Sequence, residues 1–213
     1  MFLRSVLAAC ALGAIVAPAF AGDLTVTVTT PDGKPLADAV VTLPGNGAKP
    51  NFPWKLEVAQ KDKTFTPFVL IVPQGAEVSF PNLDKFRHHV YSFSKGNKFE
   101  LELYGREDKR SVTFKSVGAA AIGCNIHDTM VGFIRIVDTP FAAKTGADGI
   151  AKIAGAPDGA AKLNVWHPYA KAKEQMTVSD VTISPGANTV SITLDVTAKS
   201  PPQKMAQTMA MNH

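Results

Sequence analysis

Short runs of alternating apolar and polar residues constrain the fold of this chain most. Beyond residue 21, no segment keeps apolar residues at the three-and-four spacing of an amphipathic helix. Strand-like runs recur instead, and Gly, Pro, Asn or Asp separate them. The expected strands are residues 24–28, 37–43, 56–58, 68–72, 77–80, 89–93, 99–103, 111–114, 132–137, 150–153, 162–166, 178–183 and 189–196. This spacing predicts an all-β protein built from sandwiches.

Composition excludes several classes of protein. Of the 213 residues, 46% are hydrophobic and 19% are charged, so the chain has enough apolar side chains to fold. A long apolar run occurs only within residues 1–21, which excludes a multi-span membrane protein. The net charge of +4 comes from scattered Lys and Arg, which is too weak a pattern to predict nucleic-acid binding.

The N-terminus has the pattern of an export signal. Arg4 precedes an apolar stretch at residues 6–16, and Ala19-Phe20-Ala21 fits a cleavage site. We therefore expect residues 1–21 to be a signal peptide and the mature chain to be periplasmic. An uncleaved anchor is disfavoured by Pro18 and by the polar switch at Asp23. Lipidation at Cys10 is rejected because too few residues precede it, so the membrane is involved only through export.

Loss of the leader would leave Cys124 as the only cysteine. An exported protein rarely keeps an idle thiol, so Cys124 is expected to have a function. His127 and Met130 follow it at three-residue intervals, and the adjacent pair His88-His89 lies at the start of the strand predicted at 89–93. Thiolate, imidazole and thioether are together the donors of a mononuclear electron-transfer copper site.

Two other chemistries explain these residues less well. A cysteine nucleophile needs a separately oriented histidine base, whereas Cys124 and His127 share one short loop. Zinc gains nothing from a thioether, and structural zinc sites usually contain more thiolates. Copper binding is the preferred prediction.

Residues 61–138 resemble the cupredoxins, the blue copper proteins. The resemblance rests on an apolar strand, the Pro73-Gln74-Gly75 turn, the run from Val78 through Asn82 and Asp84 to His88, and a Cys-x-x-His-x-x-Met loop with the spacing of amicyanins. It implies a Greek-key β-sandwich with one type 1 copper. Carried over residue by residue, it makes the ligands His88, Cys124, His127 and, axially, Met130.

The chain departs from the cupredoxin pattern at two positions. His89 stands where the family usually has Asn, and Ile126 stands where Pro is frequent before the second histidine. Because residues 88 and 89 of a strand point to opposite faces, only one of the two histidines can be a ligand. The family pattern His-x-Val favours His88, and His89 remains the alternative.

A second resemblance concerns the two ends of the chain. Residues 26–43, the turn at 145–149 and the turn at 157–159 are similar to transthyretin-like modules, which also occur as regulatory domains of carboxypeptidases. This implies a smaller, discontinuous β-sandwich from residues 22–45 plus 140–197, with the cupredoxin domain inserted at 50–139. Residues 198–213 are polar and without period, and are expected to be a disordered tail.

As a whole the chain is similar to bacterial proteins labelled methylamine-utilisation or plastocyanin-like. The combined prediction is a periplasmic, non-enzymatic copper protein that transfers single electrons to or from a redox partner protein. Two alternatives stay open. A copper carrier or chaperone would use the same ligands plus Met205, Met209 and Met211 of the tail. A metal-independent β-sandwich binding module would leave Cys124 without a role.

Overall fold

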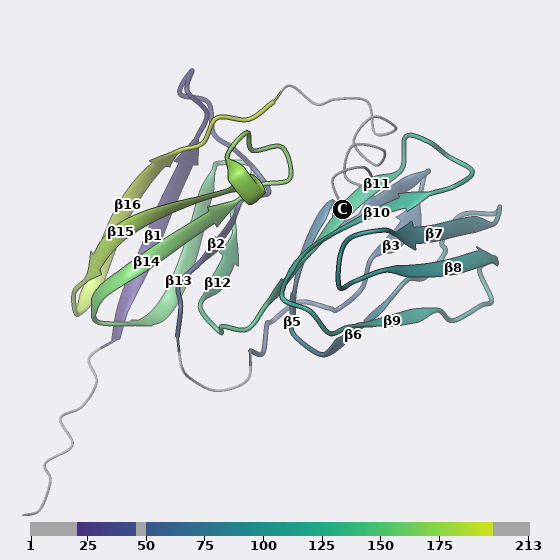
Figure 1. Ribbon diagram of the computed structural model, residues 1–213, viewed down its shortest axis with the longest axis horizontal. Coiled ribbons are helices and arrows are strands. Elements are labelled where there is room, and N and C mark those ends of the chain that lie inside the picture. The colour runs from purple at the N-terminus through teal and green to yellow at the C-terminus, as the bar shows by residue number, and fades with distance from the viewer. Residues whose placement is uncertain (1–20, 46–49, 198–213) are drawn as a thin grey trace, which may run out of the picture.

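The computed structural model describes residues 21–45 and 50–197, which form two all-β units side by side (Figure 1). The predicted all-β class is confirmed. The predicted signal peptide and C-terminal tail lie outside the described residues. Within the described part of the chain, no helix is long and apolar enough to cross a membrane.

The first unit combines strands from both ends of the chain. It contains a three-stranded sheet of order β13-β1-β16 and a four-stranded sheet of order β12-β2-β14-β15. A short 3-10 helix, η1 (Lys173–Gln175), precedes β15. The strands are β1 (Ala21–Thr29), β2 (Val40–Thr42), β12 (Ala142–Lys144), β13 (Ile150–Pro157), β14 (Gly159–Trp166), β15 (Met176–Ile183) and β16 (Gly186–Thr193).

Strand β1 is the centre of the three-stranded sheet. It pairs antiparallel with β13 and parallel with β16. Leu24, Val26 and Val28 alternate with polar residues along β1 and are fully buried in the core of this unit. In the other sheet, β2 pairs with both β12 and β14, so strands separated by about a hundred residues hold each other in place.

The second unit lies between these ends in the sequence. It has a five-stranded sheet of order β5-β11-β10-β7-β8 and two separate two-stranded antiparallel sheets, β3-β4 and β6-β9. Its core lies between the sheet and the two pairs. The strands are β3 (Ala59–Lys61), β4 (Thr64–Thr66), β5 (Val69–Pro73), β6 (Ala76–Ser79), β7 (His88–Ser92), β8 (Phe99–Tyr104), β9 (Ser111–Phe114), β10 (Gly118–Cys124) and β11 (Val131–Val137).

Strand β5 explains why an uninterrupted apolar run occurs at this point of the sequence. Leu70 and Val72 face the core of their own unit, whereas Val69 and Ile71 pack toward the other unit. A strand that is covered on both faces has no solvent side to leave polar. Across the contact, the ring of Trp166 on β14 lies edge-on to Phe133 on β11, with 6.2 Å between centroids.

Four strands lie outside the ranges expected from the sequence, and one expected strand is reduced to a bridge. Strand β10 is rich in alanine, which has low strand propensity, and β12 and the β3-β4 pair consist of only three residues per strand. The segment expected at 56–58 contributes a single bridge from Glu57 to Ser79. Strand β10 matters most, because it carries Cys124.

The strand order predicts how fragments of the chain behave. A fragment of residues 141–197 lacks β1 and β2, and so exposes the apolar faces of both sheets. We expect it to show no cooperative thermal transition by circular dichroism, and to regain one when a peptide of residues 21–43 is added. Cooperative unfolding of the fragment alone would contradict this dependence.

Candidate metal centre

Two neighbouring strands bring the candidate ligands together. His88 is the first residue of β7 and Cys124 is the last residue of β10, and these strands pair antiparallel with Cys124 opposite Val90. The backbone N–H of Asn125 then donates to the carbonyl oxygen of His89 at 3.3 Å. The pairing therefore places residues 36 positions apart at one edge of the sheet.

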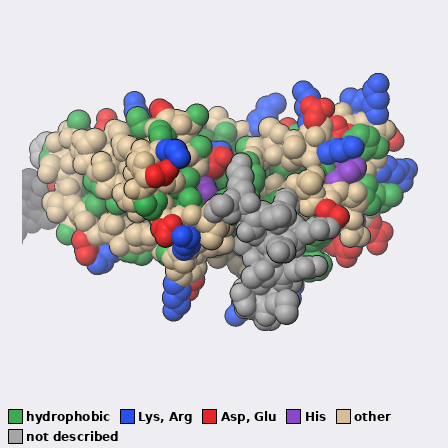
Figure 2. All heavy atoms as spheres, turned by 90° about the horizontal axis from the view of Figure 1, so that it is seen from above, with side chains coloured by type: hydrophobic (Ala, Val, Ile, Leu, Met, Phe, Trp, Pro, Cys, Tyr) green, Lys and Arg blue, Asp and Glu red, His purple; other side chains and the backbone are tan. Residues whose placement is uncertain are grey.

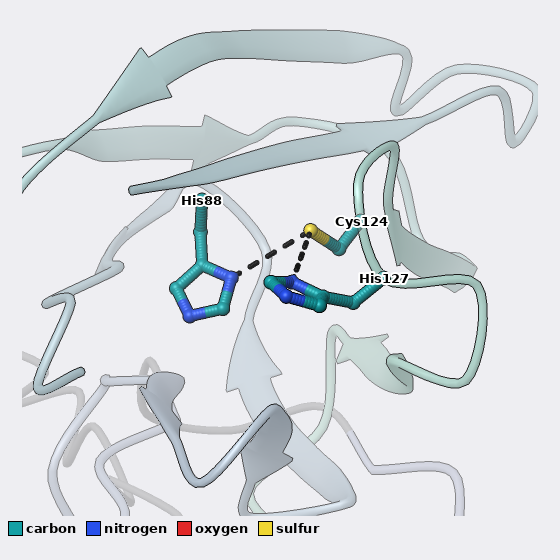
Figure 3. A group of neighbouring side chains, drawn as sticks. All are labelled: His88, Cys124 and His127. Atoms are coloured by element: carbon teal, nitrogen blue, oxygen red, sulfur yellow. Dashed lines mark hydrogen bonds between the residues drawn. The ribbon is translucent and has the colours of Figure 1, made fainter. Parts of the chain in front are cut away.

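Three donor atoms face one another at this edge (Figure 3). The Cys124 Sγ lies 3.7 Å from His88 Nδ1 and 3.9 Å from His127 Nδ1, and all three atoms lie within 4.8 Å of each other. His88 and Cys124 are buried, with exposed fractions of 0% and 3%, and His127 is half-buried. A thiol and two imidazole nitrogens that converge in this way form a donor set suited to a soft or borderline metal ion.

Met130 follows the donor loop and is buried in the same apolar core as Cys124. Its backbone N–H donates to the carbonyl oxygen of His127 at 2.9 Å, which closes a tight turn. The loop from Cys124 to Met130 is therefore held at both ends.

His89 points away from this cluster. Alternation along β7 buries His88, whereas the Nε2 of His89 lies 2.9 Å from Glu100 Oε1 on the neighbouring strand β8. The structure thus brings His88, Cys124 and His127 together and leaves His89 outside the cluster.

A buried carboxylate supports His88 from behind, and the sequence analysis missed this role. Asp84 Oδ2 accepts a hydrogen bond from His88 Nε2 at 2.8 Å. The same carboxylate accepts the backbone N–H of Asp62 at 2.8 Å and of Lys63 at 3.1 Å. Burial by itself raises the pKa of Asp84, but the bonds from His88 and the two amides outweigh it and hold the pKa below its ordinary value.

The side chain of Asn82 shapes the loop that carries Asp84. Its Nδ2 donates to the carbonyl oxygens of Phe86 and Tyr104, at 2.8 and 3.1 Å, and its Oδ1 accepts the backbone N–H of Asp84 at 2.9 Å. Buried backbone groups need such partners. A signal for this arrangement is present in the sequence, since Asp84 stands four residues before His88.

The outer side of the cluster is apolar. The ring of Phe86 lies 5.1 Å from that of His88 and 5.2 Å from that of His127, and Lys63 Nζ lies over its face at 5.6 Å. Phe86 is 41% exposed and Ile126 is 49% exposed. Burial lowers the pKa of His127, and the nearby charges of His88 and Lys63 lower it further, which favours the neutral imidazole that a metal requires.

Comparisons with known proteins add partial structural similarities. No family model and no curated protein matches the sequence. Among solved structures, a purple cupredoxin from Nitrosopumilus maritimus is 19% identical with a TM-score of 0.34, over 38% of this chain and 98% of its own. A mutant of amicyanin is 18% identical with a TM-score of 0.37, over 46% of this chain and 98% of its own. The copper-containing nitrite reductase of Thermus scotoductus is 25% identical with a TM-score of 0.38, over 54% of this chain and 28% of its own.

The buried hydroxyl of Tyr104 gives a test of the support beneath the site. It lies 2.5 Å from Gln60 Oε1 and 2.8 Å from the carbonyl oxygen of Phe80. Tyr104→Phe removes the one O–H that these two buried oxygens share, so we expect it to lower the free energy of unfolding by about 1–3 kcal/mol in urea titrations. Tyr91 is half-buried on the outer face of β7, so Tyr91→Phe should lower the free energy of unfolding by less.

Alkaline pH should lower the free energy of unfolding of the wild type more than that of Tyr104→Phe. Burial raises the pKa of Tyr104 well above its ordinary value, so the protonated form is the one that folding favours. The contribution of the protonated Tyr104 hydroxyl to the free energy of unfolding is present in full below the unfolded pKa of about 10, and it is lost as the pH rises above that value. Wild-type stability should therefore fall more steeply than that of Tyr104→Phe above about pH 10; parallel curves would contradict this.

Proposed function

We propose that this chain is an electron-transfer protein of the cupredoxin type that binds one type 1 copper ion through His88, Cys124, His127 and Met130. The observation that carries the proposal is the convergence of two imidazole Nδ1 atoms and the only described thiol within 4.8 Å. Copper held by such donors would supply one-electron chemistry between Cu(I) and Cu(II), with the thioether of Met130 as the weaker donor.

The chain's own residues have distinct parts in this proposal. The apolar core around Cys124 and Met130 excludes water from the donors. His127 is the half-buried member of the set and stands beside the exposed side chains of Phe86 and Ile126. We propose that electrons pass through this edge to a redox partner protein, and that no substrate enters the site, so that the protein is not an enzyme.

Exposed basic side chains support the proposal of a redox partner protein with an acidic surface. Lys and Arg side chains, interspersed with Asp and Glu, lie toward the end of the molecule at the right of Figure 2, where a histidine also reaches the surface. Charges at the rim of an interface mainly raise the rate of association. The exposed basic residues of the copper-binding unit include Lys95, Lys98, Arg106, Lys109, Arg110 and Lys115.

The remaining parts of the proposal concern location and architecture. The N-terminal sequence pattern supports export to the periplasm with removal of residues 1–21. The pairing of β1 and β2 with strands after residue 140 supports a copper-binding domain at 50–139 inserted into a module of 22–45 plus 140–197. We propose that this module is transthyretin-like, on the basis of its turn chemistry.

Copper titration tests the function. Addition of Cu(II) to the mature protein should give an intense visible absorption from thiolate-to-copper charge transfer, and Cys124→Ser should abolish it. Zn(II) should bind competitively without colour. A colourless, weak Cu(II) site in the unmutated protein would contradict electron transfer and favour the copper carrier.

The two adjacent histidines provide a matched pair of variants. His88→Ala removes a donor atom that faces Cys124, so Cu(II) affinity should fall by more than the roughly 10–100-fold that loss of an outer hydrogen-bond partner costs. His89→Ala removes a side chain bound to Glu100 and should keep the coloured site. Greater damage from His89→Ala, measured by competition titration, would exclude the proposed ligand set.

A further inference from the structure

We propose that Asp84 is a positioning residue for the copper site: its carboxylate fixes the Nε2–H form of His88, which leaves Nδ1 free for the metal, and its negative charge favours Cu(II) over Cu(I). The second half of this inference rests on the proposed copper function. The first half concerns the metal-free protein and stands on the contacts of Asp84 alone.

Donor and acceptor chemistry decides the form of His88. An ionised carboxylate can only accept hydrogen bonds, so the 2.8 Å contact requires that Nε2 of His88 carries the hydrogen. A neutral imidazole has one N–H, and Nδ1 is then the lone-pair nitrogen. That atom is the one that faces Cys124 Sγ at 3.7 Å. The contact with Asp84 thus selects the form of the ring that can bind a metal on the side of the thiol.

The carboxylate is itself held in a fixed orientation. Its Oδ1 accepts the N–H of Asp62 and its Oδ2 accepts the N–H of Lys63, and these two residues form the whole turn between β3 and β4. Both have positive φ, 52° and 56°, which non-glycine residues rarely adopt. Successive N–H groups in such a turn make a concave site for an anion. The hydrogen bonds therefore fix both the orientation of the Asp84 carboxylate and the conformation of the turn.

The negative charge of Asp84 affects the reduction potential of the copper site. Asp84 is 7% exposed, so solvent screens its charge poorly. A carboxylate behind a ligand histidine raises the basicity of the ring. Both effects stabilise the more highly charged ion, and so Asp84 should lower the reduction potential of the site.

The metal-free protein provides the first test. Nitrogen-15 NMR of the mature wild-type protein, with couplings from the ring protons of His88, distinguishes the two neutral forms of the ring. We expect hydrogen on Nε2 and none on Nδ1 at a pH where the ring is neutral. Hydrogen on Nδ1 would overturn the positioning role whatever metal the protein binds, and this measurement needs no variant to fold.

The second test compares two carboxylate variants of the copper-loaded protein. Asp84→Asn removes the negative charge next to His88. Glu100→Gln removes the negative charge next to His89, which points away from the cluster. For Asp84→Asn we expect Cu(II) affinity to fall about tenfold or more relative to Cu(I) affinity. A tenfold difference corresponds to a rise of about 59 mV in potential for a one-electron couple. Glu100→Gln should change the potential much less.

The outcomes separate this inference from the proposed function. Equal loss of Cu(I) and Cu(II) affinity in a folded Asp84→Asn protein, or a potential unchanged from that of Glu100→Gln, would overturn the redox role of Asp84. A wild-type protein that forms no coloured Cu(II) site would instead overturn the proposed function, and the NMR result would still decide the positioning role. If Asp84→Asn does not fold, the ring form of His88 in the wild type decides the positioning role.

Discussion

The short pairing between β7 and β10 is the interaction on which the site depends. Only where these strands run side by side can a histidine at the start of one lie against a cysteine at the end of the other. The approach is close: a Cβ atom added to Gly123 would lie 2.9 Å from the ring of Tyr91. A larger residue at 123 would therefore displace the Tyr91 side chain at the position next to Cys124.

The arrangement of the donor side chains rests on surrounding polar groups that have hydrogen-bond partners within the protein. Asn82, Asp84, Gln60 and Tyr104 are buried, and each makes hydrogen bonds that fix the backbone below the cluster. Buried polar groups that are fully partnered make a region rigid, whereas unpartnered ones cost stability. The apolar side chains on the outer side complete an environment with low access to water.

Sequence reasoning found the donors more easily than their support. Cys124, His127 and His88 were identifiable because thiol and imidazole are rare and their chemistry is specific. The class of fold followed from alternation, which strands such as β1 show clearly. Asp84 was not assigned a role, because its partners, His88 and the amides of Asp62 and Lys63, converge only through tertiary packing. Strand β10 was missed because alanine carries little information about strands.

The contact between the units limits how they can move. The unit that contains Cys124 is joined to the other unit by chain at both of its ends, and Val69, Ile71 and Phe133 are buried against Val40 and Trp166. The guanidinium of Arg135 also lies over the Trp166 ring, at 5.4 Å. A unit tethered once could swivel about its linker, but two tethers around an apolar contact remove that freedom. The two units should therefore tumble together in solution, with a single rotational correlation time, and present the His127 edge at a constant angle to anything that holds the other unit.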